Sequence, residues 1–364
     1  MVALAFPTSS SPGAIPGEGS GRLINVLAVK DGAEVRYVPA PGLDVVASPG
    51  FGAPRGGLLV DDALLLARAD NLFALDAGFK LKRIGALPGS KPVTMARDNF
   101  AISAGGPHMV ICGETGVFVV GPDANGVQGV QPYPNNTSSG ASIGAPTSVA
   151  FQDGYFFFLY DDGELLATGT TATPTNTLDW SDQSYTKCES KPCKWLRVTA
   201  SGGQIWAWGE TSTEVYSDQG LQPFPYARAQ VIPVGLLGPW CIAGFEDGWD
   251  GQQIFVAADG SVRQLNGYTP ARISTRAVER AIEAAMSGDV LRACAYTFGG
   301  NAIWSLSGPD WTWEFNANTQ AWHERASQGM DRWRAEASVL AFNRWFLGDV
   351  GNGDVLVLNP DNRS

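Results

Sequence analysis

One short motif has the spacing of a serine nucleophile. Residues 140–144 read Gly-Ala-Ser-Ile-Gly, with Ser142 at the position of the reactive hydroxyl. This pattern is catalytic where a strand leads into the serine and a helix follows it, because that turn holds the hydroxyl exposed. Here polar residues precede the motif and Pro146 follows it, and the one downstream histidine, His323, lies in a turn-rich strand region. We therefore do not expect a serine hydrolase.

Three groups of carboxylates have the residue types of a glycosidase, which needs two such groups that converge in space. The groups are Asp161, Asp162 and Glu164, then Asp247 and Asp250, then Glu210 and Glu214. Each lies beside a predicted turn, where Asp and Glu are normally solvated or bond the turn backbone. His108 is interpreted in the same way, as a turn or strand residue. No nucleophile, base and oxyanion donor come together, so we predict no enzymatic activity and no cofactor.

Five cysteines bear on metal and redox chemistry. Cys112, Cys241 and Cys294 lie in or beside apolar runs, where a free cysteine is usually a small buried hydrophobe. Cys188 and Cys193 lie close together in a polar, lysine-containing segment. We expect two solvated thiols there, rather than a disulfide or a zinc site. Zinc would need two further ligands, and the two histidines of the chain have no metal-type spacing.

The charge balance excludes one class of partner. Lys and Arg number 25 and Asp and Glu 36, which gives a net charge of −11 in a chain of 364 residues. A protein that grips nucleic acid through its phosphates needs clustered Lys and Arg, which this composition disfavours. An acidic wall past which DNA slides stays compatible with it, because like charges repel. No stretch approaches the ~20 apolar residues of a membrane helix, and the N-terminus lacks the features of a secretory signal.

A glycine-containing pair recurs along the chain with a period of 48 or 49 residues. The six pairs are Gly56-Gly57, Gly105-Gly106, Asp153-Gly154, Gly202-Gly203, Asp250-Gly251 and Gly299-Gly300. A seventh turn, without glycine, is predicted near Asn343-Arg344. Short aromatic or β-branched runs follow the pairs, as in Ile205 to Trp208. Such dipeptides supply the positive φ of two-residue hairpins, so the pattern predicts antiparallel meanders.

A period of about 40–50 residues with four strands in each repeat is typical of a β-propeller. We therefore predict an all-β chain, a propeller of about seven four-stranded blades in a single domain over residues 22–364, preceded by an arm over residues 1–21. The last repeat ends one strand short, near Leu358. A hairpin between Arg22 and Leu43 is predicted to supply this missing outer strand, because closure removes exposed sheet edges.

Two further segments depart from the β pattern. Apolar residues recur at helical spacing, which predicts one short helix over residues 275–287. These apolar residues are Val278, Ala281, Ile282, Ala285 and Met286. Ser274 and Thr275 are suited to cap its N-terminus, and Gly288 to end it. Residues 121–148 are rich in Pro, Gly and Ser, which predicts a long loop.

Four segments in the second half of the chain carry a more specific pattern. They are residues 206–224, 267–282, 313–325 and 348–358. In this order they resemble the packaged-DNA stabilisation proteins of podoviruses, also called tail nozzle or tail hub proteins. The matching positions are Gly209, Glu210, Thr213, Glu214, Gly267, Tyr268, Pro270, Arg272, Ile273, Ser274, Thr275, Val278, Glu279, Trp322, Arg325, Gly348 and Asp349.

This resemblance implies a structural protein of the virion tail that is assembled in the host cytoplasm. Six copies would form a ring below the portal and its adaptor, continue the DNA channel, retain the packaged genome and let it pass during ejection. The resemblance also implies contacts with tail fibres or tailspikes and with a plug or needle. Double-stranded DNA would pass through the lumen without sequence-specific binding.

Two hypotheses and one alternative accompany this interpretation. Acidic residues on short turns are expected to line the channel, given the net charge. The helix at residues 275–287 or the loop at 121–148 is expected to contact another subunit or the adaptor, since blades need neither. The alternative function is a kelch-like propeller that binds a glycan or a protein partner, which the glycine period also suits. It lacks the regularly placed Tyr and Trp that kelch blades carry after their glycines, and an enzyme ranks third.

Overall fold

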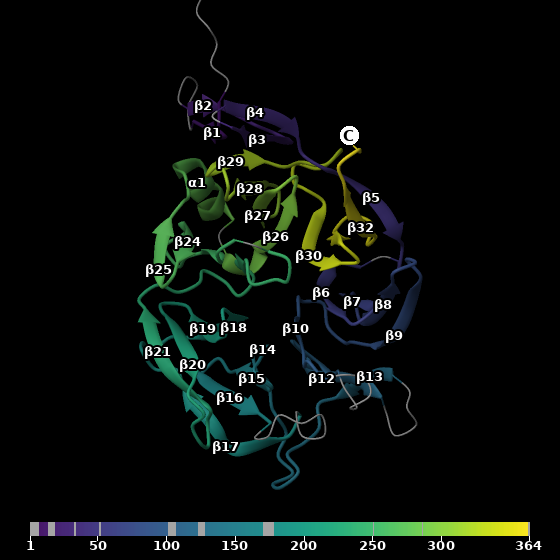
Figure 1. The fold of residues 1–364 in the computed structure, drawn as a ribbon, viewed down its shortest axis with the longest axis vertical. Helices are drawn as coiled ribbons and strands as arrows, with labels where there is room; N and C mark the ends of the chain where they lie inside the picture. Colours follow the sequence, from purple (N-terminus) through teal and green to yellow (C-terminus); the bar gives the residue numbers. More distant parts are fainter. Residues whose placement is uncertain are drawn as a thin grey trace, which may run out of the picture. The chain divides into compact units, whose positions relative to one another are not determined.

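The computed structural model describes residues 7–13, 19–32, 34–50, 52–100, 107–122, 128–169, 178–249, 251–285 and 287–362 (Figure 1). The chain divides into two compact units. One unit comprises residues 1–50 and 237–364, and the other comprises residues 51–236. Both are built mainly of antiparallel sheets, so each is considered in turn.

The unit of residues 51–236 holds four four-stranded sheets within its described part, each with its strands paired in chain order. This order is the predicted meander. The strands of the first two sheets are β6 (Pro54–Val60), β7 (Ala63–Arg68), β8 (Asn71–Asp76), β9 (Leu81–Ala86), β10 (Thr94–Arg97), β11 (Met109–Gly113), β12 (Gly116–Pro122) and β13 (Gln128–Pro132). Those of the next two are β14 (Ser148–Gln152), β15 (Tyr155–Leu159), β16 (Glu164–Thr168), β17 (Trp180–Lys187), β18 (Trp195–Ser201), β19 (Gln204–Gly209), β20 (Thr213–Asp218) and β21 (Tyr226–Ile232).

The other unit holds three further four-stranded sheets in its described residues. Two of them are meanders of β22 (Ile242–Ala243), β23 (Ile254–Val256), β24 (Val262–Asn266), β25 (Thr269–Arg272), and of β26 (Arg292–Phe298), β27 (Asn301–Ser307), β28 (Thr312–Asn316), β29 (Ala321–Glu324). The third joins β30 (Ala335–Ala341), β31 (Arg344–Asp349) and β32 (Val355–Asn359) to β5 (Gly42–Ala47). Two small sheets pair β1 (Ser11–Pro12) with β2 (Gly19–Gly21), and β3 (Val26–Asp31) with β4 (Glu34–Pro39).

Successive sheets pack against each other through their first strands. In the unit of residues 51–236, β6 contacts β10, β10 contacts β14, and β14 contacts β18. In the other unit, β22 contacts β26 and β26 contacts β30. Within each unit the sheets therefore follow one another as the blades of a propeller do.

The glycine period locates the hairpins between first and second strands. Four of these turns have positive φ at both central residues, as a two-residue turn of type I′ requires. The φ values are +49° and +90° at Asp153 and Gly154, +60° and +73° at Gly202 and Gly203, +53° and +74° at Gly299 and Gly300, and +49° and +59° at Phe342 and Asn343. The prediction from the repeat is confirmed at these positions.

The hairpin predicted at the first glycine pair is wrong. Gly56 and Gly57 lie inside β6, and the hairpin from β6 to β7 is made by Asp61 and Asp62. A Cβ at Gly56 would lie 3.1 Å from the carbonyl oxygen of Val93, so close packing against the next sheet explains this glycine. Gly105-Gly106 and Asp250 are outside the described residues, and Gly251 lies in the connection from β22 to β23.

An N-terminal segment supplies the missing outer strand, as predicted, but the strand is β5 rather than the hairpin itself. β5 pairs antiparallel with β32 along residues 42–47. The hairpin of β3 and β4 remains a separate two-stranded sheet, and β3 contacts β29 instead. Leu27 and Val38 of the hairpin pack into an apolar cluster with Trp333 and Trp345, which holds the hairpin away from the ladder of β32.

The helix is confirmed as α1 (Arg276–Ala284), with Thr275 as its N-cap and Ala285 as its C-cap. Val278 and Ile282 are buried along one face of α1, as the apolar spacing predicts. Gly288 opens the 3-10 helix Gly288–Val290 that follows. The predicted loop over residues 121–148 is corrected, because it contains the outer strand β13.

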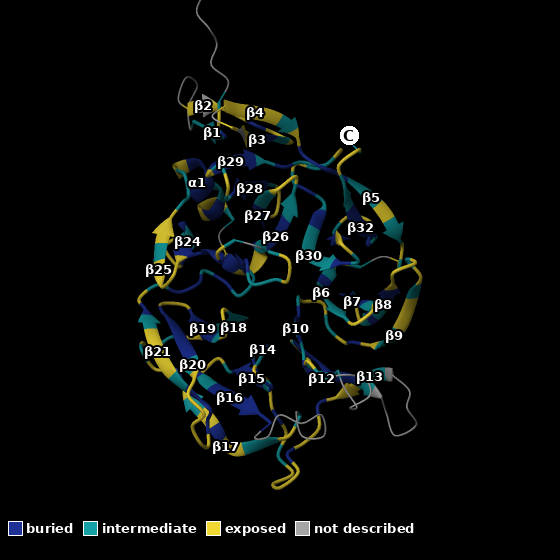
Figure 2. Ribbon diagram, viewed as in Figure 1, coloured by how far each residue is buried: buried dark blue, intermediate teal, exposed yellow. Residues whose placement is uncertain are grey.

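Many of the large aromatic residues are buried in the sheets. Eight of the twelve tryptophans are buried, as stacked blades predict, and β15 and β19 are buried over most of their length (Figure 2). Trp206 and Trp208 stack with ring centroids 5.9 Å apart, and Trp304 meets Trp322 edge to face at 6.3 Å. Such pairs add to the area that the rings bury.

Replacement of a hairpin glycine tests the turn geometry. Gly300→Ala should lower the free energy of unfolding by about 1–2 kcal/mol, the cost of a left-handed backbone for an L-residue. A Cβ there would have open space around it, so only backbone strain contributes. Gly129→Ala, in a strand without positive φ, should change stability by less than about 0.5 kcal/mol. Equal losses in urea denaturation would contradict this account of the turn.

Candidate functional site

The first signature segment centres on a buried carboxylate. Glu214 on β20 accepts hydrogen bonds from the Tyr216 hydroxyl at 2.6 Å and from the amides of Glu189 and Ser190 at 2.9 and 2.6 Å. Arg228 of β21 lies 3.4 Å from the same carboxylate. The expectation that Glu214 is solvated beside a turn is wrong, because its partners come from a distant loop and from the neighbouring strand.

The partners of Glu214 decide its charge. Burial acts to raise the pKa of this carboxyl group, but the hydrogen bonds from Tyr216 and Ser190 outweigh burial, so the pKa lies below its ordinary value. Glu214 is therefore an anion at neutral pH. Burial in turn raises the pKa of the Tyr216 hydroxyl, which stays protonated and donates to the carboxylate.

Cys188 belongs to the same cluster, which corrects a second expectation. Its thiol is buried and lies 3.4 Å from the Tyr216 hydroxyl, so it is not solvated. Burial raises its pKa to about 12, and both Cys188 and Cys193 are free thiols. The other three cysteines, Cys112, Cys241 and Cys294, are buried as predicted.

Gly209 and Thr213 shape the turn before Glu214. A Cβ at Gly209 would lie 2.8 Å from the Cys193 sulfur and 3.1 Å from the Ser212 carbonyl oxygen. The Thr213 hydroxyl donates to the carbonyl of Val234 at 2.9 Å. Glu210, between them, is exposed. The segment therefore packs one turn closely instead of presenting reactive groups.

A second buried carboxylate lies in the sheet of β26 to β29. Glu314 accepts a hydrogen bond from the Tyr296 hydroxyl at 2.8 Å and lies 2.7 Å from His323 Nε2 and 3.5 Å from Arg325 Nε. Burial acts to raise the pKa of Glu314, but the charge of Arg325 and the hydrogen bonds from His323 and Tyr296 hold it below its ordinary value. His323 therefore makes a structural contact with Glu314.

Arg325 extends this cluster toward the N-terminal residues. Its guanidinium lies 4.5 Å from the ring centroid of Trp333, within the range of a cation–π contact, and donates to the carbonyl of Pro41 at 3.0 Å. Trp322, three residues earlier, is buried and donates through Nε1 to the carbonyl of Ile273 at 2.8 Å. Two signature segments thus meet directly.

The segment of residues 267–282 joins β24 and β25 to α1. Glu279 of α1 is 5% exposed, and its carboxylate accepts from Arg272 Nε at 2.7 Å and from the Ser274 hydroxyl at 2.6 Å. Burial acts to raise the pKa of Glu279, but the bonds from Arg272 and Ser274 keep it below its ordinary value. These contacts hold the first turn of α1 against the end of β25.

The remaining signature positions are divided between a buried ion pair and an exposed turn. Asp349, next to Gly348 on β31, is buried and accepts a bidentate contact from Arg334 at 3.1 and 2.5 Å. Gly267 and Tyr268 form the turn between β24 and β25, where Tyr268 is exposed, and Pro270 lies in β25. The signature residues therefore lie in separate clusters of four sheets and do not line one cleft.

The motifs with catalytic spacing form no reaction centre. Ser142 accepts a hydrogen bond from the Gly144 amide at 3.3 Å in a loop that leads into β14, and no helix follows it. His108 Nδ1 lies 2.9 Å from the buried Asp98. Within the described residues, no three His, Cys, Asp or Glu side chains are placed to hold a metal ion, and none of the helices combines the length and hydropathy needed to cross a membrane.

The carboxylates with the residue types of a glycosidase lie mostly on turns. Hydrogen bonds from Lys187 and the Glu164 amide lower the pKa of Asp162, while burial and the charge of Asp162 raise the pKa of Glu164. Asp161 and Asp162 form the turn before β16, and Asp247 lies in the connection from β22 to β23. Asp161, Asp162 and Asp247 therefore follow the turn interpretation, whereas Glu164 opens β16 and Asp250 lies outside the described residues.

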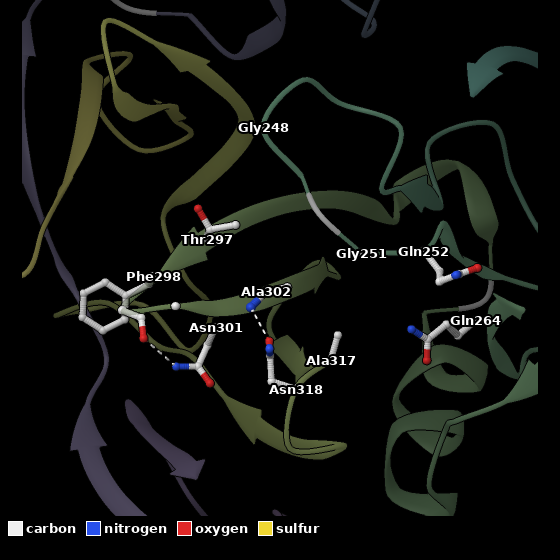
Figure 3. A pocket seen from close by; sticks show the side chains of 12 residues that line it. Gly248, Gly251, Gln252, Gln264, Thr297, Phe298, Asn301, Ala302, Ala317 and Asn318 are labelled. Carbon is white, nitrogen blue, oxygen red and sulfur yellow. Dashed lines mark hydrogen bonds between the residues drawn. The ribbon is translucent and has the colours of Figure 1, made fainter. Parts of the chain in front are cut away.

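A hollow of about 490 Å³ lies where β22 to β25 and β26 to β29 present their turns, within one unit (Figure 3). Glycines at 248, 251, 299 and 300 form part of its wall. Its polar side chains are amides and a threonine hydroxyl, including Gln252, Gln264 and Asn318. This hollow was not predicted from the sequence, because its residues come from three separate connections and from β24, β26 and β27.

The partners of the buried carboxylates were not predicted from the sequence. Tyr216 and Arg228 contact Glu214, and Tyr296 contacts Glu314, and of these three partners only Tyr216 lies inside a recognised segment. An aromatic residue two positions from a glutamate in a strand was a weak signal of the first cluster. Arg228 and Tyr296 gave no local signal, because sheet pairing alone brings them to the carboxylates.

The comparisons with known proteins agree with this geometry. Residues 24–363 match the model of a family described as "Bacteriophage P22 Gp10, beta-propeller". A search of the curated proteins finds no match. Among solved structures, the WD40 β-propeller domain of Doa1 has a TM-score of 0.52 at 9% identity, over 88% of this chain and 98% of that one. The extracellular domain of the hybrid two-component system BT4673 from B. thetaiotaomicron has a TM-score of 0.54 at 8% identity, over 87% of this chain and 40% of that one.

These likenesses establish the fold class. The chain is a seven-bladed β-propeller with four-stranded antiparallel blades and one short α-helix. At 8–9% identity, the likeness to the two solved structures shows only that the fold is shared.

Removal of one buried carboxylate tests whether the cluster stabilises the fold. Glu314→Gln should lower the free energy of unfolding by about 3–5 kcal/mol, because it leaves Arg325 buried beside a neutral partner. Glu210→Gln, at an exposed signature position, should change it by less than about 0.5 kcal/mol. The measurement is urea denaturation at pH 7, and similar stability of both variants would contradict the role given to Glu314.

The same carboxylates predict a loss of stability in acid. Glu214, Glu279 and Glu314 all have folded-state pKa values below 4.5, so the unfolded chain binds protons first as the pH falls. Their stabilisation is complete above about pH 5 and is lost as the pH falls through the folded pKa values. Denaturation from pH 7 to pH 3 should therefore show falling stability, with a shallower slope in Glu314→Gln. Parallel slopes for the two proteins would contradict this assignment.

Proposed function

Because the chain belongs to the family of bacteriophage P22 Gp10 β-propellers, we propose that it is a tail nozzle or hub subunit of a phage virion. Six copies form a ring below the portal and its adaptor. The ring continues the DNA channel, retains the packaged genome and lets it pass during ejection. The family match over residues 24–363 is the observation that carries this proposal.

The charge of the chain supports a channel role without tight DNA binding. The net charge is −11, so the surface repels the duplex instead of neutralising its phosphates. In this proposal, acidic residues on short turns face the DNA. Residues 22–364 act as one domain and residues 1–21 as an arm.

The ionisation of the buried groups supports a structural role without catalysis. Glu214, Glu279 and Glu314 are held as anions by direct partners, well away from the near-neutral pKa that suits a general acid or base. The signature positions then serve assembly through the shape of the blades. The helix α1 or the loop of residues 133–147 contacts a neighbouring subunit or the adaptor, and tail fibres or tailspikes and a plug or needle bind elsewhere on the ring.

Phage particles made without this protein test the proposal. They should package DNA and then lose it, because the channel below the adaptor is open, and wild-type protein supplied in trans should restore retention. The measurements are nuclease-resistant DNA per capsid and electron microscopy of the tail, where the protein should add a sixfold ring. Particles that keep their DNA and an unchanged tail without the protein would overturn the proposal.

A further inference from the structure

The hollow of Figure 3 has an unusual chemical character for this surface. Gly299 and Gly300 form part of its wall, and a Cβ at either would stand in open space, so a main chain from another molecule meets bare backbone at these two residues. Each of the side chains that line it within the described residues is uncharged. The side-chain amides of Gln252 and Gln264 form no hydrogen bond within the described part of the chain and lie at the hollow, as the sticks show. The site therefore offers amide donors and acceptors to a neutral, polar occupant.

The chain itself carries an exposed segment of that character. No Asp, Glu, Lys, Arg or His occurs between Ala124 and Gln152. Within this run, residues 137–140 are exposed, and they are Thr, Ser, Ser and Gly. Ser142 is exposed as well. We define residues 137–142 as the uncharged loop.

Hydrogen bonds of Asn136 and the buried side chain of Ile143 hold the two ends of the uncharged loop in place. Asn136 is buried, and its side chain donates to the carbonyl of Trp180 at 2.7 Å and accepts from the amides of Ser138 and Ser139 at 2.8 and 2.9 Å. Ile143, on the other side of the loop, is 5% exposed. The loop is therefore held in one shape before it meets a partner, which reduces the entropy cost of binding.

We propose that the uncharged loop of one copy of this chain docks into the hollow of a second copy. Hydroxyls and main-chain groups of the loop bond the amides of Gln252 and Gln264 across the contact. The surfaces differ, so the contact is heterologous, the kind that builds rings or filaments. This inference rests on the proposed function, because it names the contact that joins subunits of the proposed ring.

The physical reason for this contact is the cost of removing water from charged groups. Interface cores are depleted of charged residues, because a charge that loses water without a partner costs free energy. In a chain with 61 Lys, Arg, Asp and Glu residues, an exposed loop without charge and a hollow whose described lining is uncharged are suited to such a core. The open space at Gly299 and Gly300 then lets the backbone of the loop come close enough for the amides to bond it.

Opposite charges introduced into the loop and the hollow of the full chain test the contact. Ser139→Asp puts a carboxylate on the loop while keeping an acceptor for the Ala141 amide, which Ser139 now bonds at 3.3 Å. Gln264→Lys puts an ammonium in the hollow. Each single variant should weaken self-association about tenfold or more, because one buried charge lacks a partner. The double variant should regain most of the affinity, since the two new charges meet.

Matched controls carry the same charges elsewhere. Gln183→Asp on β17 and Gln230→Lys on β21 are exposed positions outside the contact and should associate like the wild type. Sedimentation velocity over a range of protein concentrations measures the association, and circular dichroism checks the fold. A wild-type chain that stays monomeric, single variants that associate normally, or a double variant no better than the singles would each overturn the contact.

Incorporation into particles separates this inference from the proposed function. If the chain is found in tails and the loop and hollow variants assemble normally there, this contact is refuted while the tail role stands. If the chain is absent from tails although the introduced charges change its self-association as expected, the contact stands and the tail role fails.

Discussion

Much of the structure depends on carboxylates that are buried only because their partners are buried with them. Glu214 and Glu314 each lie on the third strand of a sheet, where a tyrosine hydroxyl donates to the carboxylate and an arginine from the fourth strand, or just beyond it, faces it. An unpartnered carboxylate would be costly to remove from water, so third and fourth strands must keep one register for both charges to be met. Apolar packing tolerates small shifts that these contacts do not. The two clusters therefore specify the outer halves of their blades.

The cluster of Glu314 also connects distant parts of its unit. Arg325 passes from the carboxylate to the carbonyl of Pro41, immediately before β5 begins. Glu324 accepts hydrogen bonds from Ser10 and Arg22, and its backbone bonds the main chain of Leu23 and Asn25. The edge of β29 is thus occupied by N-terminal residues, and β5 continues from there to pair with β32. The signature residue Arg325 thus bonds Pro41, 284 residues away in sequence, and its neighbour Glu324 bonds Arg22, 302 residues away.

Local conformation was the part of this fold that sequence could predict. Positive φ at Gly202-Gly203 and Gly299-Gly300 is a property of the dipeptides themselves, so their period revealed the meanders, and the capped apolar spacing revealed α1. The failures concern residues whose state is set by distant partners. Asp61-Asp62 makes the first hairpin without glycine, Glu214 and Cys188 are buried by a loop and a strand that the sequence does not place beside them, and the outer strand is β5 because apolar packing holds β3 and β4 elsewhere. The hollow is assembled from three connections and from residues of β24, β26 and β27, and no one of these segments predicts it.

The contrast between local conformation and groups whose state is set by distant partners also bears on what the protein does. A propeller supports many functions, so the fold alone does not choose between a scaffold, a receptor and an enzyme. The ionisable groups narrow the choice physically. A catalytic acid or base must exchange its proton near the working pH, and its environment is arranged to bring its pKa there. Here the buried glutamates have lowered pKa values, while Tyr216, Tyr296 and Cys188 have raised ones, so each of these groups keeps one protonation state through the neutral range. Their chemistry is used to hold strands in register.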